Sequence, residues 1–116
     1  MKNSILSYAL KTRLKKIDFF KNNPHIAQEI TFNYLIKNGT NTVFGKEHDF
    51  KNINSYSSFS NRIPTRSYED FFPYIQRLRA GEQNILWNSK IKLFSKSSGT
   101  TNAKSKFIPV SSESLI

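Results

Sequence analysis

The sequence predicts an α+β fold, in which helices come first and short strands follow. In the first third of the chain, apolar residues recur at three- and four-residue steps, a spacing typical of amphipathic helices. Near the other end, the runs KIKLF and KFIPV are rich in β-branched and aromatic residues and are bounded by polar turns, as strands are. With 116 residues, the chain is long enough for one small domain with a modest core.

Residues from about 3 to 21 are predicted to form the first amphipathic helix. Its apolar positions follow the helical spacing and are Ile5, Leu6, Ala9, Leu10, Leu14, Ile17 and Phe20. The other face carries four basic residues: Lys11, Arg13, Lys15 and Lys16. We interpret this face as the solvated side of a helix that packs on a core, because charged outer faces are commoner than binding faces.

A second helix is predicted after a break at Asn22-Asn23-Pro24. Asn23 suits the capping position, and Pro24 suits the first helical position, where no backbone N–H is needed. The helix ends at Asn38-Gly39, since glycine tolerates the left-handed conformation that closes helices. We expect the two helices to form an antiparallel pair.

The next segment is interpreted as a connection followed by a weak helix. Residues 40–53 contain Gly45 and alternate poorly, which indicates a connection with one short extended piece. Neither His25 nor His48 has a carboxylate or a second histidine at ligand spacing, so both are interpreted as surface or packing residues. Residues 54–61 have the composition of a short helix that is weakened by Ser57, Ser58 and Ser60.

A further helix is predicted within residues 62–82. Ser67 is a good N-cap, Glu69 and Asp70 suit the positive end of the helix, and Gly81 suits its C-terminal end. Pro73 lies inside this span and either kinks the helix or marks its true first turn.

Residues 90–96 and 106–110 are predicted to be strands that flank a polar loop. After the second strand, Ser111 or Ser112 is expected to cap a new helix with Glu113 in its first turn.

The chain is strongly basic, with 18 Lys and Arg against 8 Asp and Glu and a formal net charge of +10. Such a charge favours polyanions, namely nucleic acids, anionic membranes or nucleotides, without choosing among them. The absence of cysteine excludes disulfides and thiolate metal sites. No secretory signal and no run of ~20 apolar residues is found, so a cytoplasmic protein is expected.

The loop between the predicted strands has the chemistry of a phosphate site. It offers five consecutive small residues whose backbone N–H groups and hydroxyls could donate to phosphate oxygens, and two cations. These candidate residues are Ser97, Ser98, Gly99, Thr100, Thr101, Lys104 and Lys106. A Walker A loop is excluded, because its second glycine is absent, the spacing is one residue short, and a strand follows instead of a helix.

The order SSGTT followed by a lysine strongly resembles the phosphate-binding loop of the adenylate-forming superfamily. Four blocks in the same order resemble the N-terminal part of the auxin-conjugating acyl-acid amido synthetase family, and we expect a bacterial-type member. The blocks are FGKEHDF at 44–50, RIPTRSYEDFFPYIQRLRAGE at 62–82, ILW at 85–87 and FSKSSGTTNAKSKFIPVSSESL at 94–115.

The resemblance implies an enzyme that activates a carboxylic acid with ATP and Mg²⁺ as an acyl adenylate and passes the acyl group to an amine or amino acid. Residues 98–101 would wrap the β- and γ-phosphates, and Lys106 would offset their charge as the catalytic lysine, with Lys104 the weaker candidate. One departure is Ala103, where the family often has glycine; Asn102 could take a positive φ there instead.

The resemblance also implies that residues 1–116 are a single partial domain, the N-terminal part of a larger α/β adenylating domain. The C-terminal part of that domain and a mobile C-terminal domain would be absent. On this interpretation the chain alone is inactive, and the strands belong to a larger sheet. The alternative is a small basic module that binds anionic membrane or nucleic acid through the face of Lys11, Arg13, Lys15 and Lys16.

Overall fold

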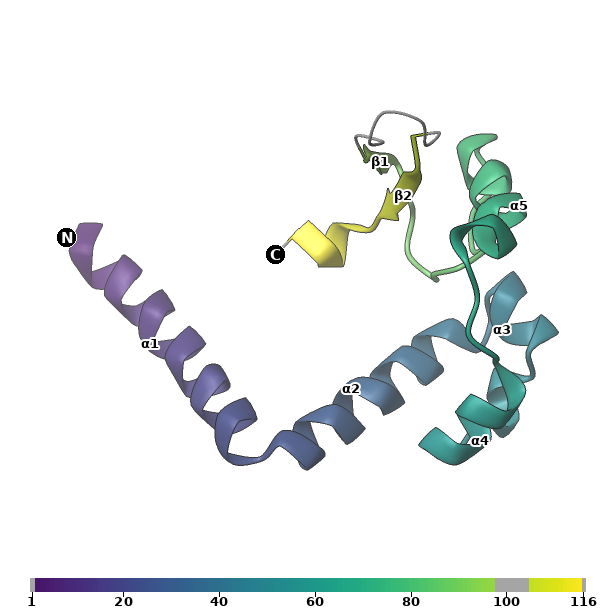
Figure 1. Ribbon diagram of the computed structural model, residues 1–116. Helices are drawn as coiled ribbons and strands as arrows, with labels where there is room; N and C mark the ends of the chain where they lie inside the picture. The colour runs from purple at the N-terminus through teal and green to yellow at the C-terminus, as the bar shows by residue number, and fades with distance from the viewer. Residues whose placement is uncertain (1, 98–104, 116) are drawn as a thin grey trace. The chain divides into compact units, whose positions relative to one another are not determined.

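The computed structural model describes residues 2–97 and 105–115 and consists of two compact units (Figure 1). The first unit spans Met1–Tyr34 and the second spans Leu35–Ile116, and each is described by itself. The described residues are mostly helical and include one two-stranded antiparallel sheet, as expected of an α+β chain. A larger α/β sheet is not seen in this part of the molecule.

Two long helices follow one another at the N-terminal end. Helix α1 spans Lys2–Asn22, and helix α2 spans Pro24–Gly39, so the predicted boundaries are confirmed. Asn23 closes α1, since its backbone N–H and its side-chain amide both donate to the carbonyl of Phe19. Neither α1 nor any other described helix has an apolar stretch long enough to cross a bilayer.

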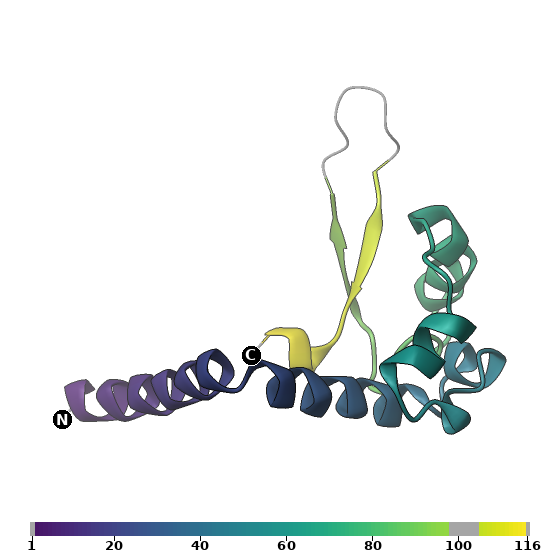
Figure 2. The ribbon, with the colours of Figure 1, turned by 60° about the horizontal axis from the view of Figure 1, so that its bottom comes forward.

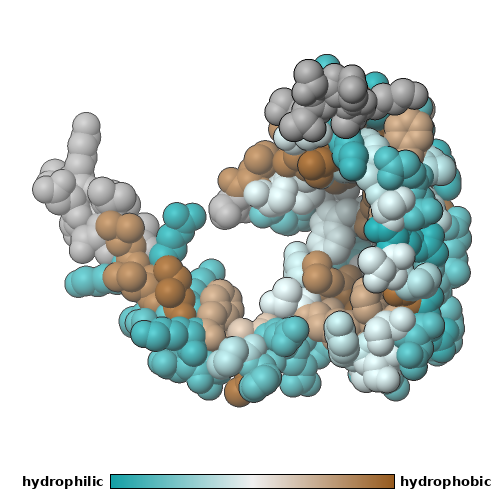
Figure 3. Space-filling model, viewed as in Figure 1, coloured by the Kyte–Doolittle hydropathy of each residue, from teal (hydrophilic) through white to brown (hydrophobic). Residues whose placement is uncertain are grey.

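The predicted antiparallel pairing of α1 and α2 is wrong. Apolar side chains of both helices remain about half exposed, at 56% for Leu14, 57% for Ile17 and 56% for Ile30. Apolar side chains on the surface of α1 are visible in Figure 3. The single residue between the helices explains the error, because an antiparallel helical hairpin needs a connection of about 2–5 residues.

The predicted extended connection at residues 40–53 is in fact helical. Helix α3 spans Val43–Glu47, and a 3₁₀ turn, η1, spans Phe50–Asn52. Thr42 starts α3: its hydroxyl donates to the carbonyl of Gly39 at 2.6 Å and accepts from the N–H of Gly45 at 3.0 Å. This buried hydroxyl couples the end of α2 to the start of α3. The alternation of apolar and polar residues, from which a strand is predicted, does not indicate such a link.

Two further helices each begin with a reciprocal cap. Helix α4 spans Tyr56–Arg62 and is capped by Ser55 with Ser58, and helix α5 spans Tyr68–Arg79 and is capped by Ser67 with Asp70. Both helices were predicted. Pro73 lies well inside α5, so it does not mark the first turn, and Gly81 follows the helix with a φ of +99°.

The core of the second unit lies between α5 and the segment that follows it. Leu78, Ile85 and Ile91 are its buried centre, and five partly buried residues pack against them. Those residues are Val43, Tyr74, Leu86, Trp87 and Phe94. The first N–H groups of α3 donate to the carbonyls of Asn84 and Ile85 at 3.0 Å, which ties α3 to the same segment.

The two strands form an antiparallel hairpin, which Figure 2 shows as two long arms. Strand β1 spans Leu93–Lys96 and pairs with β2, Phe107–Val110, so that Lys96 stands opposite Phe107. Both strands lie within their predicted ranges. The helix predicted after β2 is a 3₁₀ turn, η2, Ser112–Leu115, and the hydroxyl of Ser89 donates to its Glu113 at 2.8 Å.

Candidate functional site

Two of the predicted phosphate-site residues face each other where the hairpin strands end. The N–H of Ser97 donates to the carbonyl of Lys106 at 2.9 Å, and the N–H of Lys106 donates to the hydroxyl of Ser97 at 3.2 Å. The sheet therefore brings together residues that are nine positions apart in the sequence. The other predicted site residues, Ser98, Gly99, Thr100, Thr101 and Lys104, lie outside the described residues.

The side chain of Lys106 rests on an aromatic ring from helix α5. Its Nζ lies 5.2 Å from the centroid of the Tyr68 ring, within the range of a cation–π contact. Lys106 is exposed, so its ammonium group also has access to solvent. The hairpin thus presents one oriented positive charge at the point where β2 begins.

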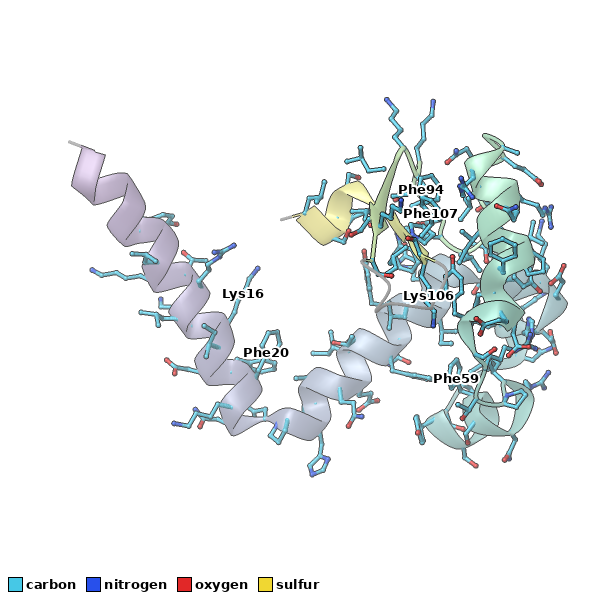
Figure 4. The ribbon with its side chains drawn as sticks, turned by 45° about the horizontal axis from the view of Figure 1, so that its top comes forward. Lys16, Phe20, Phe59, Phe94, Lys106 and Phe107 are labelled. Atoms are coloured by element: carbon cyan, nitrogen blue, oxygen red, sulfur yellow. The ribbon has the colours of Figure 1, made fainter. Side chains whose placement is uncertain are left out.

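Tyr68 also binds the backbone of β2. Its hydroxyl accepts from the N–H of Phe107 at 2.9 Å and lies 3.4 Å from the carbonyl oxygen of the same residue. At the other end of α5, the Arg79 guanidinium stacks over the Phe107 ring at 4.0 Å. Figure 4 labels Phe107 on β2, Phe94 on β1, and Lys106, which directly precedes β2.

Sequence reasoning missed Tyr68 as a site residue. Its block, RIPTRSYEDFF, carries the predicted cap at Ser67, the acidic first turn and part of the family resemblance, and none of these points to Tyr68. An aromatic residue directly after a helix cap is the available signal. That signal could not identify Phe107 as the partner, because the two residues are 39 positions apart.

A second polar cluster, around His48, is structural. The His48 ring stacks on Phe44 with 4.1 Å between centroids, and its Nδ1 lies 2.9 Å from the carbonyl of Phe44. Nη2 of Arg66 lies 2.7 Å from Nε2 of His48. Since an arginine only donates, Nε2 accepts and Nδ1 carries the proton. The interpretation of His48 as a packing residue is confirmed.

Beside this cluster, Tyr74 connects α5 to α3. Its hydroxyl donates to the carboxylate of Glu47, and this hydrogen bond, together with burial, raises the pKa of Tyr74 above its ordinary value of 10.0. Tyr74 and Tyr68 lie on the same helix, but Tyr74 contacts α3, whereas Tyr68 contacts β2.

The described part of the chain contains no preformed cluster of metal-ligating side chains. No group of three or more His, Asp and Glu side chains among residues 2–97 and 105–115 is placed to hold a metal ion.

Comparison with known proteins gives a consistent family. The model of the GH3 family N-terminal domain matches residues 13–116. The chain is 32% identical over 103 residues to indole-3-acetic acid-amido synthetase GH3.2 of Arabidopsis thaliana, covering 88% of this chain and 19% of that protein. It is 33% identical over 87 residues to Jasmonoyl--L-amino acid synthetase JAR4 of Nicotiana attenuata, covering 74% of this chain and 15% of that protein.

The chain thus spans less than a fifth of the length of these relatives. Both are plant proteins, so the expectation of a bacterial-type member stays a prediction. The resemblance to acyl-acid amido synthetases noted in the sequence is confirmed, because the matched family and the named relatives are of that kind. The chain belongs to the GH3 family: residues 13–116, which are nearly the whole of this chain, match the N-terminal domain of that family.

Proposed function

We propose that this chain is part of an ATP-dependent acyl-acid amido synthetase, with Lys106 at its phosphate site. The observation that carries the proposal is the pairing of Ser97 with Lys106, which places a hydroxyl and a cation at the two ends of the segment that contains Ser98 to Lys104. Family membership and the activities for which the relatives are named support the reaction class.

The reaction has two steps. A carboxylate oxygen of the acid attacks the α-phosphorus of ATP, the bond from that phosphorus to the bridging oxygen breaks, and pyrophosphate leaves. The nitrogen of an amine or amino acid then attacks the acyl carbon, the bond to the AMP oxygen breaks, and the amine loses a proton. Lys106 would stabilise the negative charge that grows on the departing pyrophosphate, which is electrostatic stabilisation of the transition state.

The proposal includes ATP with Mg²⁺, a carboxylic acid and an amine as the bound species, and a cytoplasmic location. The residues that bind the adenine, the acid and the metal are assigned to the rest of the enzyme. The 116-residue chain alone is therefore expected to be inactive, since it supplies only one side of the ATP site.

The test begins with the intact mass of the native protein from its source cell, followed by ATP–pyrophosphate exchange of that protein. The panel of acids should include indole-3-acetic acid and jasmonic acid. Acid-dependent exchange by a product several times heavier than 13.5 kDa would support the proposal. A native product of 13.5 kDa, or exchange by the isolated 116-residue chain, would contradict the assignment of a partial site.

A second candidate function is a basic module that binds an anionic membrane or nucleic acid. The exposure of the basic face of α1, with Lys11, Arg13, Lys15 and Lys16, favours it. Binding to DNA or anionic vesicles that weakens steeply with salt would support this function. Absence of binding at every salt concentration would reject it.

A further inference from the structure

We propose that Tyr68 is a positioning residue that sets the place of Lys106. This inference deepens the proposed function and rests on it, since it concerns the residue that would face the phosphates. Two independent contacts carry it: the hydroxyl of Tyr68 binds the backbone of Phe107, and its ring lies beneath the ammonium group of Lys106.

The hydroxyl of Tyr68 provides a hydrogen-bond partner for a backbone N–H on the outer edge of β2. The N–H and carbonyl of Lys106 face Ser97 on the neighbouring arm. In an antiparallel pair, the backbone groups of the next residue point away from the partner strand. Those groups belong to Phe107, and the hydroxyl of Tyr68 accepts from its N–H at 2.9 Å. The residue that follows Lys106 is therefore held by α5.

The ring of Tyr68 acts on the side chain. A lysine at an exposed loop end has a flexible four-carbon stem, and fixing its rotamers costs conformational entropy. A cation–π contact at 5.2 Å favours the rotamers that keep the ammonium group near α5. One side chain thus restrains both the backbone after Lys106 and its charge.

Arg79 adds a third contact between the same two elements. Its guanidinium lies 4.0 Å over the Phe107 ring, one helix length away from Tyr68 along α5. Because residues at both ends of α5 contact Phe107, the first residue of β2 is held by this helix as well as by β1. A positioning role for Tyr68 follows from this rigid support.

The test uses two substitutions in the native enzyme. Tyr68→Phe keeps the ring under Lys106 and removes the hydroxyl, whereas Tyr68→Leu removes both. We expect kcat of ATP–pyrophosphate exchange to fall about threefold in Tyr68→Phe and about tenfold in Tyr68→Leu, with KM for the acid unchanged. Tyr74→Phe is the matched control. It also removes a tyrosine hydroxyl from α5, but that hydroxyl binds Glu47 and not β2.

A double-mutant cycle separates positioning from general stability. If Tyr68 acts through Lys106, then Tyr68→Leu combined with Lys106→Ala should be no slower than Lys106→Ala alone. Additive losses, or equal losses in Tyr74→Phe and Tyr68→Phe, would overturn the proposal.

Hydrogen exchange of the Phe107 amide tests the contact without any activity. Peptides that cover residues 105–110 should exchange faster in Tyr68→Phe than in the wild-type protein and in Tyr74→Phe. Unchanged exchange would overturn the proposal. A wild-type enzyme that shows this protection but has no pyrophosphate exchange with any acid would overturn the proposed function instead, and would support the contact between Tyr68 and β2.

Discussion

The side-chain amide of Gln83 makes two hydrogen bonds to the backbone of Ile91. The N–H of Ile91 donates to Oε1 at 2.8 Å, and Nε2 donates to the carbonyl of Ile91 at 3.1 Å. This pair of bonds closes the segment between α5 and β1, which carries the buried Ile85. The side chain of Gln83 therefore holds the end of this core segment, two residues before β1 begins.

We predict that Gln83→Ala destabilises the second unit by about 1–3 kcal/mol, because it leaves two partly buried backbone groups of Ile91 without their partner. The measurement is urea denaturation followed by tryptophan fluorescence, since Trp87 packs against the same core. Gln76→Ala is the control: Gln76 is exposed and its side-chain oxygen accepts from the exposed Arg79 at 3.0 Å, so its effect should stay within about 0.5 kcal/mol. Equal losses in both variants would contradict the role given to Gln83.

We predict that Gly45→Ala destabilises the second unit more than an ordinary helix substitution. A Cβ at Gly45 would lie 1.9 Å from the carbonyl oxygen of Gly39, and backbone cannot move aside as a flexible side chain can. The expected loss is about 2–3 kcal/mol, in the upper part of the usual range for overpacking, because the clash is with backbone. It is measured by the same denaturation, with the exposed Lys46→Ala in the same helix as the control. A stable Gly45→Ala protein would show that α3 does not approach α2 so closely.

The predictable part of this fold is the part with local signals. The caps at Ser67 and the end at Gly81 were read correctly, because a cap is made by residues a few positions apart. Helix α3 was missed, since it depends on Thr42 bonding to the end of α2 and on backbone carbonyls more than 40 positions away. Five residues with poor periodicity cannot signal such a partner.

The candidate site divides in the same way. Composition and order predict Ser97 and Lys106 as phosphate-site residues, because such a site concentrates its donors in one stretch of sequence, and the structure places these two residues side by side. The contacts of Tyr68 could not be predicted from the sequence, since they depend on the packing of α5 beside β2. Side chains that support a site from another element are found from the fold and not from the motif.

We predict that the second unit becomes less stable in acid, because the cap of α5 loses its stabilising effect when Asp70 is protonated. Hydrogen bonds from Ser67, first from its backbone N–H and then from its hydroxyl, hold the pKa of Asp70 below its ordinary value of 3.8. A lowered pKa means that the folded state favours the carboxylate. The stabilisation is therefore present above pH 3.8 and is lost as the pH falls through the lower, folded-state value.

The experiment compares thermal unfolding of the wild-type protein and Asp70→Asn between pH 7 and pH 2. At pH 7 the variant should melt at a lower temperature, and the difference between the two proteins should shrink below pH 3.8. Using the difference removes the contribution of other carboxylates that titrate in the same range. A gap that stays constant down to pH 2 would mean that Asp70 does not stabilise the cap through its charge.

We predict that Lys106→Ala and Thr101→Ala each lower the rate of adenylate formation at least tenfold in the native enzyme, or about 1.4 kcal/mol of transition-state stabilisation. For Lys106 the reason is its position at the start of β2, where Ser97 and Tyr68 hold it at the end of the phosphate-site segment. For Thr101 the reason is the sequence pattern alone.

Lys92→Ala is the control, because Lys92 is also exposed but precedes β1 at the other end of the hairpin. Circular dichroism should show that the three variants remain folded. Unchanged exchange in both site variants would reject the phosphate site, and equal loss in Lys92→Ala would show that overall charge, and not the placement of Lys106, supports the reaction.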